Sequence, residues 1–201
     1  MIMTLPNKLT LIRILMIPVF IVLFYIPLFG IKNYLLTGLF ILAGLTDWFD
    51  GYLARRLKMQ TEFGAFLDPV ADKLMVSMVL VLLVSAHPGW LLAIPATVII
   101  GRELTISAVR EWMANVGERT KVAVSIIGKF KTTAQMVAIG FLLFEEPIAG
   151  IPTLQIGYVL LYLAAILTLW SMYLYLQAAW PSLNATMANS PEEEDKQQLD
   201  S

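Results

Sequence analysis

Four aspartates occur between residues 47 and 72, at spacings that place them in two pairs on helix faces. Asp47 and Asp50 fall on one face of a helix, and Asp68 and Asp72 lie one turn apart on another. Ionised carboxylates gathered in a dry site repel one another, and an unpaired one is very costly. A divalent cation relieves this repulsion, and an oxygen-only ligand set favours Mg²⁺ or Mn²⁺ over zinc.

Small residues and an arginine accompany the aspartates. Gly51 and Ala54 share the face of Asp47, where they leave room for a ligand to approach closely. Arg55 lies at the edge of that face and could reach a phosphate. A helix N-cap is the simpler interpretation of Asp68 alone, but it leaves the other three aspartates unexplained. A cation-transport site explains the carboxylates but leaves the glycines and Arg55 unexplained.

The composition is that of a membrane protein. Hydrophobic residues make up 58% of the 201 positions and charged residues only 14%, against about 45–50% and 25% in soluble domains. The chain contains no cysteine, which excludes disulfides and thiolate metal sites within it. The single histidine, His87, follows an apolar run and is interpreted as a loop residue at the membrane surface.

The apolar pattern predicts an all-α integral membrane protein, a bundle of six transmembrane helices after a short N-terminal juxtamembrane segment. The expected helices cover residues 11–29, 34–58, 66–86, 90–113, 125–144 and 154–180. Residues 1–181 would form one membrane domain. Residues 182–201 carry five acidic residues and one lysine, and we expect them to form a disordered, solvated acidic tail.

Lysine and arginine are distributed unevenly between the two expected membrane faces. One face would hold most of them, whereas Lys32 is the only basic residue in a clear loop on the other. Because basic residues concentrate on the cytoplasmic side, this face is expected to be cytoplasmic. An even number of helices then places both termini and the aspartates there.

The pattern D-x₂-D-G-x₂-A-R-x₈-G-x₃-D-x₃-D, from Asp47 to Asp72, resembles the signature of the CDP-alcohol phosphatidyltransferase family at every fixed position. Other stretches similar to the family are LPNKLTLIRI, FGAFLDPVADK, GRELTISAVREWMA and IGKFKTTAQM. The resemblance covers roughly residues 4 to 180. It implies a transferase of phospholipid biosynthesis in the bacterial cytoplasmic (inner) membrane, with CDP-diacylglycerol as donor, a homodimeric assembly and no nucleic-acid partner.

The resemblance also implies roles for individual residues. Two ions, Mg²⁺ or Mn²⁺, would be held by Asp47, Asp50, Asp68 and Asp72. Asp72 would also be the general base that takes the proton from the acceptor hydroxyl. The donor CDP-diacylglycerol would contact Gly51, Ala54, Arg55 and Thr61, with Asn7, Thr10 and Arg13 from the amino-terminal segment.

The acceptor is the part of the function that the aspartates leave open. The segments GRELTISAVREWMA and GKFKTTAQM favour sn-glycerol 3-phosphate, whose phosphate would be bound by Arg102, Arg110, Lys129 and Lys131. An internal ion pair between Arg102 and Glu103 is an equally good interpretation of those two residues. Inositol phosphate, serine or a phospholipid are alternative acceptors, and a divalent-cation transporter is the alternative from a different class.

Overall fold

A computed structural model describes residues 5–57, 62–115 and 126–188, and every regular element in these ranges is an α-helix. The helices are α1 (Leu5–Tyr25), α2 (Lys32–Leu57), α3 (Glu62–Ala86), α4 (Trp90–Asn115), α5 (Ile126–Phe144) and α6 (Thr153–Ala188). The prediction of an all-helical chain is therefore confirmed for these residues.

Two helix starts differ from the prediction. Helix α1 begins at Leu5 and ends at Tyr25, so it takes in much of the expected juxtamembrane segment and stops before Pro27. Helix α3 begins at Glu62, so Asp68 lies inside the helix and its interpretation as an N-cap is wrong. Pro69 removes one backbone hydrogen bond from α3 without ending it.

The last helix is longer than expected. Helix α6 continues to Ala188, so residues 182–188 of the segment predicted as a tail are helical. The remaining acidic part of that segment, residues 189–201, lies outside the described residues.

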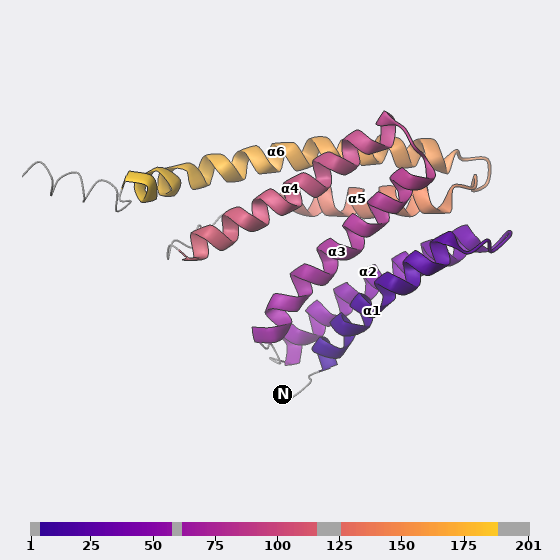
Figure 1. Cartoon of the computed structure of the whole chain (residues 1–201), viewed down its shortest axis with the longest axis horizontal. Coiled ribbons are helices and arrows are strands. Elements are labelled where there is room, and N and C mark those ends of the chain that lie inside the picture. Colours follow the sequence, from indigo (N-terminus) through magenta and orange to yellow (C-terminus); the bar gives the residue numbers. More distant parts are fainter. Residues whose placement is uncertain (1–4, 58–61, 116–125, 189–201) are drawn as a thin grey trace, which may run out of the picture.

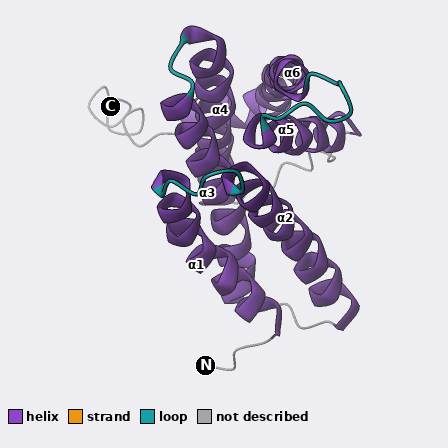
Figure 2. Ribbon diagram, turned by 90° about the vertical axis from the view of Figure 1, so that its right-hand side faces the viewer, coloured by secondary structure: helices purple, strands orange, loops and turns teal. Residues whose placement is uncertain are grey.

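The helices form two groups that are joined by α3 and by the contact of α2 with α5 (Figures 1 and 2). Helices α4, α5 and α6 pack together, and α1 packs on α2 and α3. Helix α3 also contacts α4 and α5, while α2 contacts α5. The shared core contains large side chains with almost no exposure, including Phe20, Phe40, Leu80, Leu83 and Ile99.

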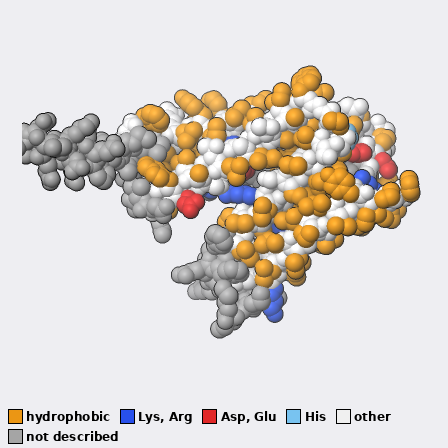
Figure 3. Space-filling view, in the orientation of Figure 1, with side chains coloured by type: hydrophobic (Ala, Val, Ile, Leu, Met, Phe, Trp, Pro, Cys, Tyr) orange, Lys and Arg blue, Asp and Glu red, His pale blue; other side chains and the backbone are white. Residues whose placement is uncertain are grey.

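Apolar side chains cover much of the face of the bundle that Figure 3 shows. Leu15 and Val159, for example, are 66% and 69% exposed. Four helices contain apolar stretches long enough to cross a membrane, at Asn7–Tyr25, Pro69–Ala86, Trp90–Ala114 and Thr153–Pro181. An apolar surface of this extent is what contact with lipid requires, so the fold is that of a membrane protein.

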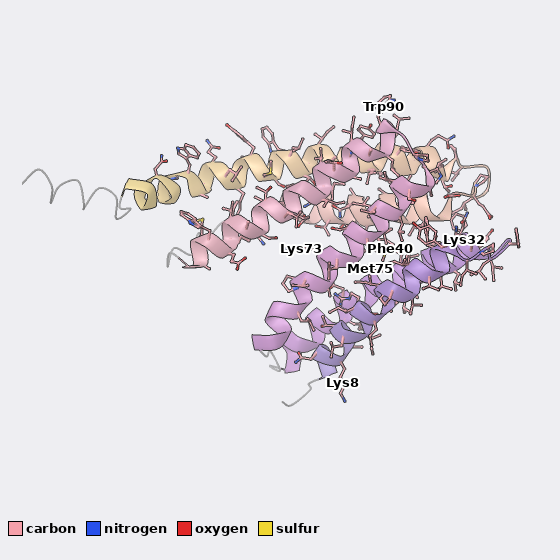
Figure 4. All side chains as sticks on the ribbon, viewed as in Figure 1. Lys8, Lys32, Phe40, Lys73, Met75 and Trp90 are labelled. Atoms are coloured by element: carbon pink, nitrogen blue, oxygen red, sulfur yellow. The ribbon has the colours of Figure 1, made fainter. Side chains whose placement is uncertain are left out.

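The described connections, at residues 26–31, 87–89 and 145–152, lie at one end of the bundle. Lys8 and Lys32 mark the opposite ends of the bundle in Figure 4. At the end of Lys32, His87 Nε2 lies 3.4 Å from a carboxylate oxygen of Glu145. The hydroxyl of Tyr34 donates a hydrogen bond of 2.5 Å to Glu146. These contacts link the α5–α6 connection to the α3–α4 connection and to the first turn of α2, at the end away from the aspartates.

Gly157 lets α6 approach α5 closely. A Cβ atom added at Gly157 would lie 2.9 Å from Cγ of Leu142 and 3.2 Å from its backbone nitrogen. Because the backbone cannot move aside easily, Gly157→Ala should lower stability by about 1–3 kcal/mol. Gly38→Ala is the matched control, since no heavy atom lies within 4 Å of a Cβ there. Thermal unfolding in detergent measures both variants, and equal melting temperatures would contradict the close packing.

Candidate active site

Asp72 lies on α3 at the junction of two cavities. One cavity, of about 150 Å³, also contains Asp47 and Arg13 and is called the aspartate cavity here. The other, of about 220 Å³, contains most of the basic side chains near Asp72 and is called the cationic cavity. Val76, Thr132 and Met136 line both cavities. A carboxylate thus stands where the two spaces meet.

The aspartate cavity contains an ion pair between α1 and α2. Nη1 of Arg13 donates a hydrogen bond of 2.6 Å to Oδ1 of Asp47. Arg13 is only 1% exposed, and Asn7 and Thr10 of the same helix are also buried. The three predicted amino-terminal residues therefore belong to the packed part of α1, and Arg13 reaches the aspartates.

The other predicted donor-site and metal-site residues are placed by their helices. Asp50 follows Asp47 on α2, with Gly51, Ala54 and Arg55 after it, and Asp68 precedes Asp72 by one turn on α3. The side chains of these five lie outside the described part of the structure, as does Thr61 as a whole. Among the described side chains, no three His, Cys, Asp or Glu residues gather at one point.

The cationic cavity carries a net positive charge. Its charged lining residues are Lys73, Arg102, Arg110 and Lys131 on the positive side and Asp72 and Glu103 on the negative side. Four formal positive charges against two negative ones leave an excess of two. Figure 3 shows basic side chains in the hollow between α4 and the lower group of helices. A cavity of this charge is suited to a dianion.

Glu103 binds two of the basic residues at once. Its Oε1 accepts a hydrogen bond of 2.9 Å from Arg102 Nη1 and one of 2.6 Å from Lys131 Nζ. Arg102 Nη2 also donates to Ser171 Oγ at 3.1 Å. The internal Arg102–Glu103 pair considered from the sequence is therefore present. The contact with Lys131 was not predicted, because it joins helices 28 residues apart in the chain.

Arg110 and Lys73 are held differently. The guanidinium carbon of Arg110 lies 5.5 Å from the centroid of the Tyr175 ring, a cation–π contact. No described carboxylate lies within ion-pair distance of Arg110. Lys73, on α3 in Figure 4, donates a hydrogen bond to Ser107 of α4. Arg110 is thus the lining cation most available to an anion.

An apolar groove adjoins the aspartate cavity. It lies between α2 and α5, has a volume of about 720 Å³ and includes Ile41, Val137, Phe141 and Phe144. The groove and the aspartate cavity have shared lining residues, which are Phe40, Gly44, Thr132 and Met136. A carboxylate site is therefore continuous with a lipid-sized apolar surface on one side and with the cationic cavity on the other.

Comparison with known families identifies the relatives of this chain. A family model described as CDP-alcohol phosphatidyltransferase matches residues 3–170. The chain belongs to the CDP-alcohol phosphatidyltransferase family. This membership confirms the resemblance seen in the aspartate pattern and decides against the cation-transporter alternative.

Individual members of the CDP-alcohol phosphatidyltransferase family are similar to the chain over most of its length. A protein of Sodalis glossinidius is 52% identical over 88% of this chain and 95% of its own. A protein of Haemophilus influenzae is 52% identical over 89% of this chain and 94% of its own. A protein of Yersinia enterocolitica is 50% identical over 90% of this chain and 97% of its own. All three are named CDP-diacylglycerol–glycerol-3-phosphate 3-phosphatidyltransferase.

Gln135 is a residue of the cationic cavity that the sequence analysis did not identify. Gln135 lines the cavity and is only 5% exposed. It follows Lys131 by four residues on α5, so the two side chains share a helix face. This spacing from a predicted phosphate ligand is the signal that could have identified Gln135.

Proposed function

We propose that this protein transfers the phosphatidyl group of CDP-diacylglycerol to the 1-hydroxyl of sn-glycerol 3-phosphate and releases CMP. The observation that carries the proposal is the continuity of three spaces around Asp72. The apolar groove, the aspartate cavity and the cationic cavity lie side by side. A lipid donor, its pyrophosphate and a phosphorylated acceptor need these three surfaces. The relatives that match most of the chain carry the name of this activity.

The charge of the cationic cavity favours a phosphorylated acceptor. Its excess of two positive charges complements the near-dianionic phosphate of glycerol 3-phosphate. Serine is a zwitterion without a phosphate and does not match that excess. Inositol phosphate does match it, so the relatives' names, and not the charge, favour glycerol phosphate.

In this proposal the chain's own residues bind the acceptor and move one proton. Arg110 and Lys131 bind the acceptor phosphate, and Arg102 of the same cavity assists. Lys129, on α5, is assigned to the same phosphate, and its side chain lies outside the described part of the structure. Asp72 accepts the proton of the 1-hydroxyl. The hydroxyl oxygen forms a bond to the lipid-side phosphorus, and the bond from that phosphorus to the bridging oxygen breaks. CMP leaves with the electron pair of the broken bond.

The donor set around Asp72 fits divalent cations. Asp47 and Asp72 line the aspartate cavity, and Asp50 and Asp68 lie one helical turn from them along α2 and α3. All four residues are carboxylates and offer the oxygen ligands that these cations prefer. We assign two Mg²⁺ or Mn²⁺ ions to these four residues. Such ions, when bound, neutralise the charge that develops on the pyrophosphate oxygens.

The apolar groove suits the acyl chains of the donor. Along α5 it extends from Thr132 to Phe144, which spans about 18 Å at 1.5 Å per residue. Half of a hydrocarbon layer measures about 15 Å. Acyl chains that start beside the aspartates could therefore lie in the groove through one leaflet. The nucleotide part of the donor is assigned to the stretch that holds Gly51, Ala54, Arg55 and Thr61, with Asn7, Thr10 and Arg13 on α1.

The proposal includes a membrane arrangement. All six helices would span the bacterial cytoplasmic membrane, since α2 and α5 measure about 39 and 29 Å against a hydrocarbon thickness of about 30 Å. Both termini and the aspartates would face the cytoplasm, because Lys8, Arg13 and Lys73 belong to that end. A homodimer, as the family resemblance implies, completes the proposal.

Arg110→Ala should raise the KM for glycerol 3-phosphate roughly 10- to 100-fold, the effect of losing one charge-assisted contact. The KM for CDP-diacylglycerol should change little, because Arg110 lines the cationic cavity alone among the three spaces. Lys131→Ala should also raise the KM for glycerol 3-phosphate. It removes one positive charge from the cavity and leaves the negative charge of Glu103 less balanced. Lys32→Ala removes a cation at the opposite end and is the control. If Arg110→Ala raised only the KM for CDP-diacylglycerol, Arg110 would belong to the donor site and its assignment to the acceptor phosphate would be wrong.

Release of CMP by the purified protein tests the proposed function. CDP-diacylglycerol is supplied with glycerol 3-phosphate, inositol phosphate, serine or a phospholipid as the acceptor. Of these four acceptors, we expect only glycerol 3-phosphate to support CMP release. Release that depends on inositol phosphate or serine would replace the proposed acceptor while leaving the family reaction in place.

A further inference from the structure

Gln135 carries a buried polar atom that no described residue binds. The side chain lies on α5 and is 5% exposed, and among the described residues none forms a hydrogen bond with its Oε1 atom. Gln135 lines the cationic cavity together with Asp72, Arg110 and Lys131. A buried carbonyl oxygen without a partner is costly, so such an atom beside a binding cavity calls for a donor from the ligand.

The chemistry of the acceptor decides which donor this is. Oε1 of Gln135 can only accept a hydrogen bond, and phosphate oxygens also accept, so the two do not match. The hydroxyls of glycerol 3-phosphate are donors. In the proposed reaction the proton of the 1-hydroxyl goes to Asp72. The 2-hydroxyl is then the donor without an assigned partner.

We propose that Gln135 is a specificity-determining residue that accepts a hydrogen bond from the 2-hydroxyl of the acceptor. This inference rests on the proposed function. The acceptor would then be held at three points. Arg110 and Lys131 would bind its phosphate, Asp72 would contact its 1-hydroxyl, and Gln135 would accept a hydrogen bond from its 2-hydroxyl. Three contacts around a chiral carbon distinguish its mirror images. Gln135 therefore selects sn-glycerol 3-phosphate over sn-glycerol 1-phosphate.

The test compares acceptors that differ at one group. The probes are sn-glycerol 3-phosphate, sn-glycerol 1-phosphate and 3-hydroxypropyl phosphate, which lacks the 2-hydroxyl. The wild-type protein should prefer the first over each of the others by roughly 10-fold or more in kcat/KM. Gln135→Met keeps the length of the side chain and removes the accepting oxygen, so this preference should fall towards one.

Two further variants separate recognition from structure. Gln135→Glu keeps an accepting oxygen and adds a charge, so it should lower kcat/KM for every phosphorylated probe and keep the ratio between them. Gln155→Met, on α6 outside the cationic cavity, should change neither the rates nor the ratio. Because Gln135→Glu can be measured even where Gln135→Met does not fold, the proposal stays testable.

The outcomes are distinct. A ratio near one in Gln135→Met with a retained ratio in Gln135→Glu supports the proposal. A wild-type ratio in Gln135→Met, or a ratio near one in the wild type or in Gln135→Glu, overturns it. Failure of the wild-type protein to use any glycerol phosphate is a different result, since it refutes the proposed function itself.

Discussion

Asp72→Asn should reduce kcat by roughly 10²- to 10⁴-fold, the contribution of a positioned general base. Asparagine keeps the shape of the side chain and cannot take the proton of the acceptor hydroxyl. Asp72 is also the charged residue shared by the aspartate and cationic cavities, so its loss removes a contact from both. The measurement is steady-state CMP release at saturating concentrations of both substrates.

Two controls accompany this variant. Glu146→Gln makes the same change from carboxylate to amide at the other end of the bundle, where Glu146 contacts Tyr34, and should keep wild-type turnover. Thermal unfolding should show that Asp72→Asn is folded. Wild-type kcat in a folded Asp72→Asn protein would remove Asp72 from the role of base.

Removal of divalent cations should abolish turnover, the second of the two largest effects expected. Four aspartates and a pyrophosphate cannot share one site without positive charge to offset their repulsion. Treatment with excess chelator should therefore bring CMP release to the background level. Addition of Mg²⁺ or Mn²⁺ should restore it.

A chelator already saturated with Mg²⁺ is the control for this experiment, and it should leave the rate unchanged. Donor binding offers a second readout, because CDP-diacylglycerol should also bind more weakly after chelation. Full turnover in buffer free of divalent cations would contradict the assignment of Asp47, Asp50, Asp68 and Asp72 as metal ligands.

The helices were predictable because a membrane span leaves a long apolar run in the sequence. The starts of α3 and α5 were predicted within four residues. The errors occurred where local signals conflict with packing. Helix α3 begins at Glu62, before the expected residue 66, and continues through Pro69, and α6 extends past Pro181 to Ala188. A proline that a packed helix tolerates cannot be recognised from its neighbours in the chain.

The candidate site was predictable where it depends on one helix at a time. The faces of Asp47 and of Asp72 follow from helical spacing alone. The pairs Arg13–Asp47 and Glu103–Lys131 join residues 34 and 28 positions apart, so only the packing of separate helices defines them. The place of Gln135 in the lining of the cationic cavity likewise depends on how α3, α4 and α5 pack.

The most direct test of the account measures both products of one reaction. Purified protein receives CDP-diacylglycerol and labelled glycerol 3-phosphate, and CMP and labelled lipid are quantified in the same sample. We expect one molecule of labelled phosphatidylglycerophosphate for each CMP, and a rate of formation of both products that is lower by roughly 10²-fold or more with Asp72→Asn. CMP release without labelled lipid, or equal labelling by Asp72→Asn, would contradict the account.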